Sequence, residues 1–166
     1  MLTPSLGDRT VKYTELFDYK DGQIYKKGSK KPFGHFDKRV GYIRCRVNKK
    51  SLLVHRIIYA MFNGDVMPEH DVDHVDRDKL NNRIENLRPA TRGQNVVNSK
   101  VRSDNPYGYK GVTYHKASGK YAAQTMKDQV RIHIGLFDTP EQAATAYNQK
   151  IEELFGDYAV KNVIKP

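Results

Sequence analysis

The chain has 166 residues, enough for one ordinary domain or two small ones with a modest core. Hydrophobic residues make up 38% and aromatic residues 10% of the chain, a content that excludes a globally disordered protein. The formal net charge of +10 favours a polyanionic partner, nucleic acid before membrane, over a basic surface that is merely solvated.

Cysteine usage and hydropathy restrict the setting further. Cys45 is the only cysteine, so an intramolecular disulfide and a paired-cysteine zinc site are both excluded. Residues 1–9 lack the apolar core of a signal peptide, and no apolar run is long enough to cross a bilayer. We therefore expect a protein of a reducing cytosol, bacterial or phage-infected, without a membrane partner.

Strand-like runs with glycine punctuation open the chain and predict a small antiparallel sheet. They cover residues 16–19, 23–25 and 41–47. In the third run Tyr42, Arg44 and Arg46 alternate with apolar residues and therefore share one face. Arg44 and Arg46 are predicted to bind DNA, although a solvated face fits the pattern as well.

A helix is predicted next. It starts with Ser51 as N-cap, runs to Phe62 and ends at Asn63-Gly64. His55 lies inside this segment. A histidine in such a position is more often packed and hydrogen-bonded than catalytic, so a structural role is expected.

The densest polar stretch covers residues 70–88 and continues to Asn98. Phosphodiester hydrolysis needs a hard cation, which carboxylate and amide oxygens bind well, and Asp73 with an asparagine supplies such oxygens. It also needs a base that is neutral near pH 7, and His74 is the candidate. Adjacent strand residues point to opposite faces, so Asp73 and His74 can share a centre only where the strand ends, twists or bulges.

Two other interpretations fit this stretch less well. Asp and Asn also cap helices and stabilise turns without any metal, but this explains neither a histidine directly after the aspartate nor the spaced asparagines. A calcium loop fits poorly, because the aspartates lack EF-hand spacing and residues 71–80 contain no glycine.

These residues resemble the HNH nucleases of the homing-endonuclease branch. The resemblance rests on Val72-Asp73-His74, Asn82-Arg83, Glu85-Asn86-Leu87 and Gln94-Asn95, and with segment 54–64 it covers residues 13–98. It implies a ββα-metal fold that binds Mg²⁺, with Mn²⁺ as a substitute, and cuts DNA to a 5′-phosphate and a 3′-hydroxyl.

The resemblance also implies a role for each site residue. Asp73 and Asn95 would bind the metal, His74 would be the general base, and Asn86 would hold the backbone around His74. Asn98 lies about one helical turn beyond Asn95 and is the alternative ligand, with Asn95 favoured.

A polar, basic stretch predicts a domain boundary. The expected organisation is a nuclease domain over 1–98, a basic linker over 99–106 carrying Lys100 and Arg102 as DNA contacts, and a second domain over 107–166. Three strands are predicted in the second domain, over residues 109–114, 120–126 and 130–134. Thr139-Pro140 then opens a capped helix that Gly156 ends. The fold class is α+β: the ββα-metal nuclease domain, then a small three-stranded antiparallel sheet plus one helix.

Residues 107–162 resemble the ethylene-response-factor (APETALA-type) DNA-binding domain of plant regulators. The matching segments are 109–112, 119–123, 134–139 and 141–147. The resemblance implies a sheet that lies in the major groove of DNA. Several positions of this chain depart from the arginine or tryptophan of the plant pattern, which leaves the base specificity open. It carries these contacts onto this chain: Lys110, Thr113, Lys120, Gln124, Met126, Arg131 and His133. A small αβ packing or protein-binding module is the alternative.

The combined prediction is a metal-dependent DNA endonuclease that cuts double-stranded DNA at a specific site and is homing or phage-borne. It would act as a monomer or as a dimer assembled on DNA, without a small-molecule cofactor. The alternative is a DNA-binding regulator with an inactive nuclease-like domain. An RNA-binding or ribosomal accessory protein is compatible with the charge alone.

Overall fold

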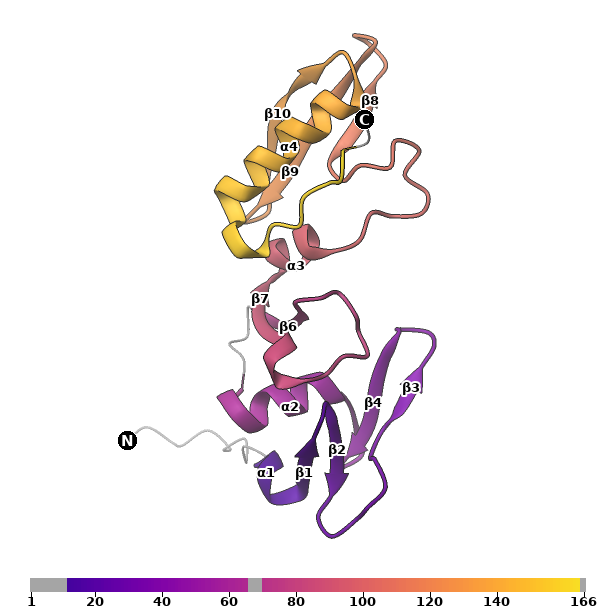
Figure 1. Ribbon diagram of the computed structural model, residues 1–166, viewed down its shortest axis with the longest axis vertical. Helices are drawn as coiled ribbons and strands as arrows, with labels where there is room; N and C mark the ends of the chain where they lie inside the picture. The colour runs from indigo at the N-terminus through magenta and orange to yellow at the C-terminus, as the bar shows by residue number, and fades with distance from the viewer. Residues whose placement is uncertain (1–11, 66–69, 165–166) are drawn as a thin grey trace, which may run out of the picture. The chain divides into compact units, whose positions relative to one another are not determined.

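The computed structural model describes residues 12–65 and 70–164 (Figure 1). The segment 1–9 considered above for a signal peptide lies outside the described residues. The chain divides into two compact units, and among the described residues unit 1 comprises 12–65 and 78–88 and unit 2 comprises 70–77 and 89–164. Helices and strands are mixed throughout, which confirms the α+β class.

Unit 1 begins with six short elements and a helix. In chain order they are α1 (Tyr13–Leu16), β1 (Phe17–Lys20), β2 (Gln23–Lys26), β3 (His35–Asp37), β4 (Tyr42–Val47), β5 (Lys50–Leu53) and α2 (Val54–Asn63). β1 and β2 form a hairpin, and β4 is the central strand of the antiparallel sheet β3–β4–β5. A 3-10 helix, Ile84–Asn86, lies in the second segment of the unit, where the Ile84 N–H donates to the Tyr19 hydroxyl at 3.1 Å.

The expected N-cap at Ser51 is wrong. Ser51 lies in β5, opposite Arg46 of β4, and α2 begins only at Val54. The two-residue turn Asn48-Lys49 has positive φ at both positions, +48° and +64°, which is the type I′ geometry that joins twisted hairpin strands. Pairing with β4 therefore takes the first residues of the expected helix.

The end of α2 and the environment of His55 match the expectation. Gly64 is the C-cap, with φ +78° and its N–H bonded to the Ala60 carbonyl. His55 is buried, and its ring centroid lies 5.0 Å from that of Tyr42. Packing therefore accounts for this histidine.

Unit 2 contains a strand–strand–helix motif and then a sheet with one helix. Its elements are β6 (His70–His74), β7 (Leu87–Thr91, in this unit from Pro89), α3 (Arg92–Asn98), β8 (Val112–His115), β9 (Lys120–Lys127), β10 (Val130–Phe137), α4 (Pro140–Phe155) and a 3-10 helix (Gly156–Tyr158). β6 and β7 pair as a two-stranded sheet, and β10–β9–β8 is the strand order of the antiparallel sheet. The three strands and the helix predicted after residue 107 are confirmed.

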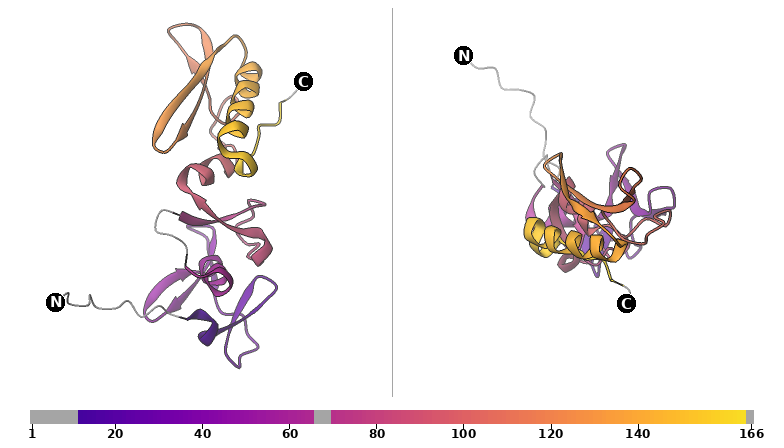
Figure 2. Two further views of the ribbon diagram at one scale, coloured as in Figure 1. Left: turned by 90° about the vertical axis from the view of Figure 1, so that its left-hand side faces the viewer. Right: turned by 90° about the horizontal axis from the view of Figure 1, so that it is seen from above.

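Helix α4 covers one face of the three-stranded sheet, as two views show (Figures 1 and 2). It starts with the predicted capping box: the Thr139 hydroxyl accepts from the Gln142 N–H, the Gln142 side chain accepts from the Thr139 N–H, and Pro140 follows the cap. Gly156 ends it.

The core under α4 crosses the predicted domain boundary. Val97 of α3 belongs to the same buried cluster as Tyr109, Ala143, Ile151 and Phe155. The compact units therefore do not coincide with the division expected at 99–106, because an apolar residue before this segment is buried together with residues after it.

Lys110 makes a second connection to α3. Its Nζ donates to the backbone carbonyls of Val97 at 2.6 Å and Ser99 at 3.0 Å. Burial, followed by the charge of Arg77, lowers the pKa of Lys110 from its ordinary 10.5 to about 8. The ammonium therefore caps the carboxyl end of α3.

Among the described residues, no helix has the length and apolar character needed to cross a membrane.

Gly111 should tolerate no side chain. It has φ +73°, and an added Cβ would overlap the ring of Tyr147. Gly108 has nearly the same φ, +70°, but open space around it. Gly108→Ala should cost about 1 kcal/mol of unfolding free energy through backbone strain alone, and Gly111→Ala at least about 3 kcal/mol, measured by urea denaturation. Equal costs would show that Tyr147 does not constrain Gly111.

Lys110 should make stability rise with pH. Its pKa is about 8 in the folded protein and 10.5 when exposed, so above pH 8 the unfolded chain holds the extra proton and the unfolding free energy increases. Cys45 acts in the opposite direction only above about pH 9, because burial raises its pKa to about 11. Between pH 7.5 and 9 the unfolding free energy of the wild type should therefore rise relative to that of Lys110→Met. Parallel curves would contradict the expectation.

Candidate active site

Strand β6 ends with the two residues predicted to be catalytic. Asp73 is 8% exposed and His74 is 4% exposed. The strand stops at His74, whose carbonyl accepts a hydrogen bond from the Arg77 N–H at 3.0 Å, and Arg77 has φ +64°. A tight turn thus follows His74 at once, so the strand ends at the pair, which is one of the conditions under which two adjacent strand residues could serve one centre.

Asn98, the last residue of α3, holds this strand end. It is 2% exposed, and its Nδ2 donates both to the Asp73 carboxylate at 2.7 Å and to the His74 carbonyl at 2.9 Å. Because both partners are acceptors, the amide can face them only through its nitrogen. Its Oδ1 is buried and has no hydrogen-bond partner among the described residues.

Asn95 lies one turn earlier on the same helix and is half-buried. α3 begins with a capping box, in which the Thr91 side chain accepts from the Gln94 N–H and the Gln94 side chain accepts from the Thr91 N–H. The cap fixes the first turn of a short helix. Asn95 follows Gln94 directly, so the capped first turn fixes the backbone that carries the Asn95 side chain.

Asn86 and Asn82 belong to unit 1. Asn86 is 9% exposed, and its Nδ2 donates to the Asn81 carbonyl at 2.8 Å. Asn82 is 1% exposed. In unit 2, the Asn98 side chain donates to the His74 carbonyl. This bond depends on how α3 packs on β6, and no spacing in the sequence indicated it.

The donor set fits a hard divalent cation. Asp73 offers a carboxylate and the α3 asparagines offer amide oxygens, the ligand types that Mg²⁺ prefers. The described residues contain no group of three or more His, Cys, Asp or Glu side chains arranged for a metal.

Six of the residues predicted to contact DNA share the sheet face that is opposite α4. Ala123 and Val112 pair across β9 and β8 and are both buried in the core, so their strand neighbours point away from α4. The cross-strand pairs on that open face are Thr113 with Ala122, Gln124 with His133, and Met126 with Arg131. Lys120, two residues before Ala122, completes the set and forms an ion pair with Asp138 at 2.9 Å.

The other predicted contacts lie elsewhere. The Lys110 ammonium is bonded to carbonyls at the end of α3 and is therefore not on the open face. Lys100 is exposed, and the exposed Arg102 pairs with Asp104 through two bonds of 2.9 and 2.7 Å.

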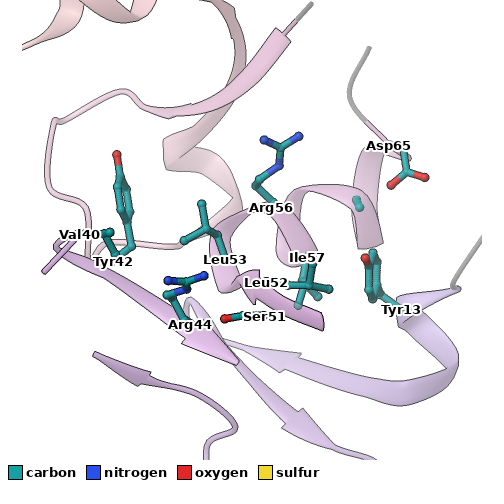
Figure 3. Close-up of a pocket in the computed structure, with 11 residues that line it drawn as sticks. Tyr13, Val40, Tyr42, Arg44, Ser51, Leu52, Leu53, Arg56, Ile57 and Asp65 are labelled. Carbon is teal, nitrogen blue, oxygen red and sulfur yellow. The ribbon is translucent and has the colours of Figure 1, made fainter. Parts of the chain in front are cut away.

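Arg44 and Arg46 lie in unit 1, on β4. Arg44 donates to Asp37 at 3.2 Å and lines a cavity of about 700 Å³ together with Tyr42 and Arg56 (Figure 3). Its lining also includes apolar side chains, among them Leu53. Arg46 is exposed and donates to the Lys49 carbonyl. Neither Asp73 nor His74 lines this cavity.

One family model and three known proteins match parts of the chain. Residues 52–97 match the family described as HNH endonuclease. A protein of Acanthamoeba polyphaga mimivirus, named as an uncharacterized HNH endonuclease, is 39% identical over 112 residues, which are 67% of this chain and 57% of that protein. Protein 3.8 of Escherichia phage T7 is 27% identical over 63% of this chain and 86% of its own length.

A third relative comes from the SPbeta prophage of Bacillus subtilis, and its name assigns it to the HNH homing endonucleases. It is 31% identical over 47% of this chain and 48% of its own length. The chain thus spans only about half the length of the two relatives named as HNH endonucleases. No solved structure matches the chain.

These findings do not support the ethylene-response-factor resemblance of residues 107–162, which stays a prediction. The matched residues 52–97 include β6, β7 and α3 as far as Val97, and with them Asp73, His74 and Asn95. The chain is a homologue of HNH endonucleases and carries an HNH endonuclease domain at residues 52–97.

Proposed function

We propose that this protein is a metal-dependent endonuclease that hydrolyses phosphodiester bonds of double-stranded DNA at a specific site. The observation that carries the proposal is the buried Asp73-His74 pair at the end of β6, which lies within the matched residues 52–97 and is held by Asn98 just beyond them. The net charge of +10 supports a polyanionic substrate. The viral and prophage origin of the relatives supports a phage-borne or homing role in a host cytosol.

Asp73 and Asn95 would hold Mg²⁺, and Mn²⁺ would substitute. Asn98 is the weaker ligand candidate, because its nitrogen faces Asp73 and turns its Oδ1 away from the carboxylate. Its hydrogen bond occupies one oxygen of Asp73 and fixes the orientation of the carboxylate. Asn98 is therefore a positioning residue. When bound, the metal would neutralise charge on the phosphate and on the leaving oxygen.

His74 would accept the proton of the attacking water. Its backbone carbonyl accepts from both the Asn98 side chain and the Arg77 N–H, which fixes the backbone that carries the imidazole. A neutral histidine near pH 7 suits this role. Asn86 would keep the segment around His74 in place, and the products would carry a 5′-phosphate and a 3′-hydroxyl.

The open face of the β8–β10 sheet would contact the duplex. Arg131, Lys120 and His133 supply positive charge or donors there, and Gln124 and Thr113 supply polar groups for base edges. Arg44, Arg46, Lys100 and Arg102 would add phosphate contacts. Lys110 is not included, because its donors are bonded to α3.

Replacing His74 should abolish cutting but not binding. With Mg²⁺ and a pool of random duplex DNA as substrate, His74→Ala should lower the cleavage rate about 10²- to 10⁴-fold, the usual contribution of a general base. DNA affinity, measured by gel shift in chelator, should change little. His35→Ala, an exposed histidine on β3, is the matched control and should cut at the wild-type rate. Equal rates for His74→Ala and wild type would overturn the role of His74, and binding without any metal-dependent scission in wild type would indicate a regulator.

Asn95 and Asn98 should separate in two measurements. Asn95→Ala should raise the Mg²⁺ concentration needed for half-maximal cleavage at least several-fold and change the unfolding free energy little, because Asn95 is only half-buried. Asn98→Ala should cost about 2 kcal/mol of unfolding free energy, since the buried Asp73 carboxylate and the His74 carbonyl both lose a donor. If instead Asn98→Ala raised the Mg²⁺ requirement at unchanged stability, Asn98 would be the ligand.

A further inference from the structure

Helix α3 is built into the core of the sheet module that follows it. By sheet module we mean β8–β10, α4 and the 3-10 helix after it, residues 107–158. Val97, on the last turn of α3, is 2% exposed, and its cluster includes Ile151 at 0% and Phe155 at 9% exposed. Gly93 lies so close that an added Cβ would be 3.4 Å from the Phe155 ring. The helix that carries Asn95 therefore packs against α4 through Gly93 and Val97.

Polar contacts reinforce this packing at both ends of α3. Lys110, just before β8, donates to the Val97 and Ser99 carbonyls at 2.6 and 3.0 Å. Before α3, the Tyr158 hydroxyl donates to the Pro89 carbonyl of β7 at 2.7 Å. Strand, helix and module are thus joined by apolar, charged and neutral contacts, all within unit 2.

The backbone between α3 and the module contributes little to this union. Residues 102–104 are exposed, and the Arg102 side chain bonds only two residues away, to Asp104. Asn105 closes a local turn, accepting from the Tyr107 and Gly108 N–H groups. Apart from the Ser99 carbonyl, which accepts from Lys110, segment 99–106 makes local hydrogen bonds that do not join the two parts.

We propose that α3 and the sheet module are one rigid body, so that packing at Val97 and Lys110, and not the length of segment 99–106, sets the distance between the DNA bound by the sheet and the phosphate that is cut. The part that concerns cutting rests on the proposed function. A flexible segment of this length would have an end-to-end spread of about 15 Å, or roughly four base pairs. If the two parts form a rigid body, the cut falls at one fixed distance from the DNA sequence that the sheet binds.

The first test lengthens the connection. Gly-Ser-Gly-Ser is inserted between the exposed Ser103 and Asp104, and cut positions relative to the bound site are mapped at nucleotide resolution. The expected result is the wild-type offset with the wild-type spread. An offset that moves, or cuts that spread over several base pairs, would show that the segment sets the spacing.

A second test needs no cleavage. Spin labels are placed at Val96→Cys, exposed on α3, and Lys116→Cys, exposed in the β8–β9 turn, with Cys45→Ala to remove the native thiol. The β8–β9 turn that carries Lys116 is on the side of the sheet where Tyr121 pairs with Phe137, just before α4 begins, and α3 packs near the end of α4. The separation is therefore of the order of the ~24 Å length of α4, within reach of pulsed electron paramagnetic resonance. One narrow distance, unchanged by the insertion, is expected; a broad or shifted distribution would overturn the rigid body.

Weakening the packing should have the opposite effect to lengthening the segment. The double variant Val97→Ala with Lys110→Met should broaden the label distance and, in an active enzyme, spread the cut positions. Val163→Ala, 86% exposed, is the control and should do neither. The wild type could cut no DNA while the distance between the spin labels is narrow and unchanged by the Gly-Ser-Gly-Ser insertion. In that case the nuclease proposal fails and the rigid body stands. If DNA is cut but the distance is broad, the rigid body fails alone.

Discussion

Helix α3 takes part in two structures at once, and this constraint organises unit 2. At its carboxyl end the Asn98 amide bonds the strand end that carries Asp73 and His74, while the neighbouring Val97 is buried under α4. Seven residues are too few for a stable isolated helix, so tertiary contacts must hold it. The buried core of the sheet module supplies them, and the candidate active site therefore depends on residues far beyond it in sequence.

Burial of polar groups explains why the asparagine matters. A carboxylate such as Asp73, at 8% exposure, loses most of its hydration and needs donors in return. Asn98 provides one of these donors, and the same Nδ2 also donates to the His74 carbonyl. A single side chain thus couples the orientation of the carboxylate to the backbone of the histidine. In the proposed enzyme the same coupling would keep metal ligand and base in register.

The differences between expectation and structure in unit 1 come from strand pairing. Ser51-Leu52-Leu53 has the composition of a helix start, and Ser51 is a good N-cap residue. The segment is nevertheless β5, because Asn48-Lys49 forms a type I′ turn without the glycine that usually announces one. Pairing with β4 satisfies backbone groups that a helix would otherwise have used. A local pattern cannot indicate this, since the partner strand decides it.

Local sequence was sufficient for the α+β class, for the capped helix α4, for the hairpin strands of the sheet module and for Asp73 and His74 as candidates. Caps, turns and alternation act over a few residues, and a candidate pair next to spaced asparagines is visible as a motif. Long-range packing decided the rest. It removed Lys110 from the predicted DNA contacts, placed Val97 in the core of a module expected to be separate, and made Asn98 the donor to the strand end. These contacts join residues 13 to 58 positions apart, and no local periodicity encodes which side chains will meet across such distances.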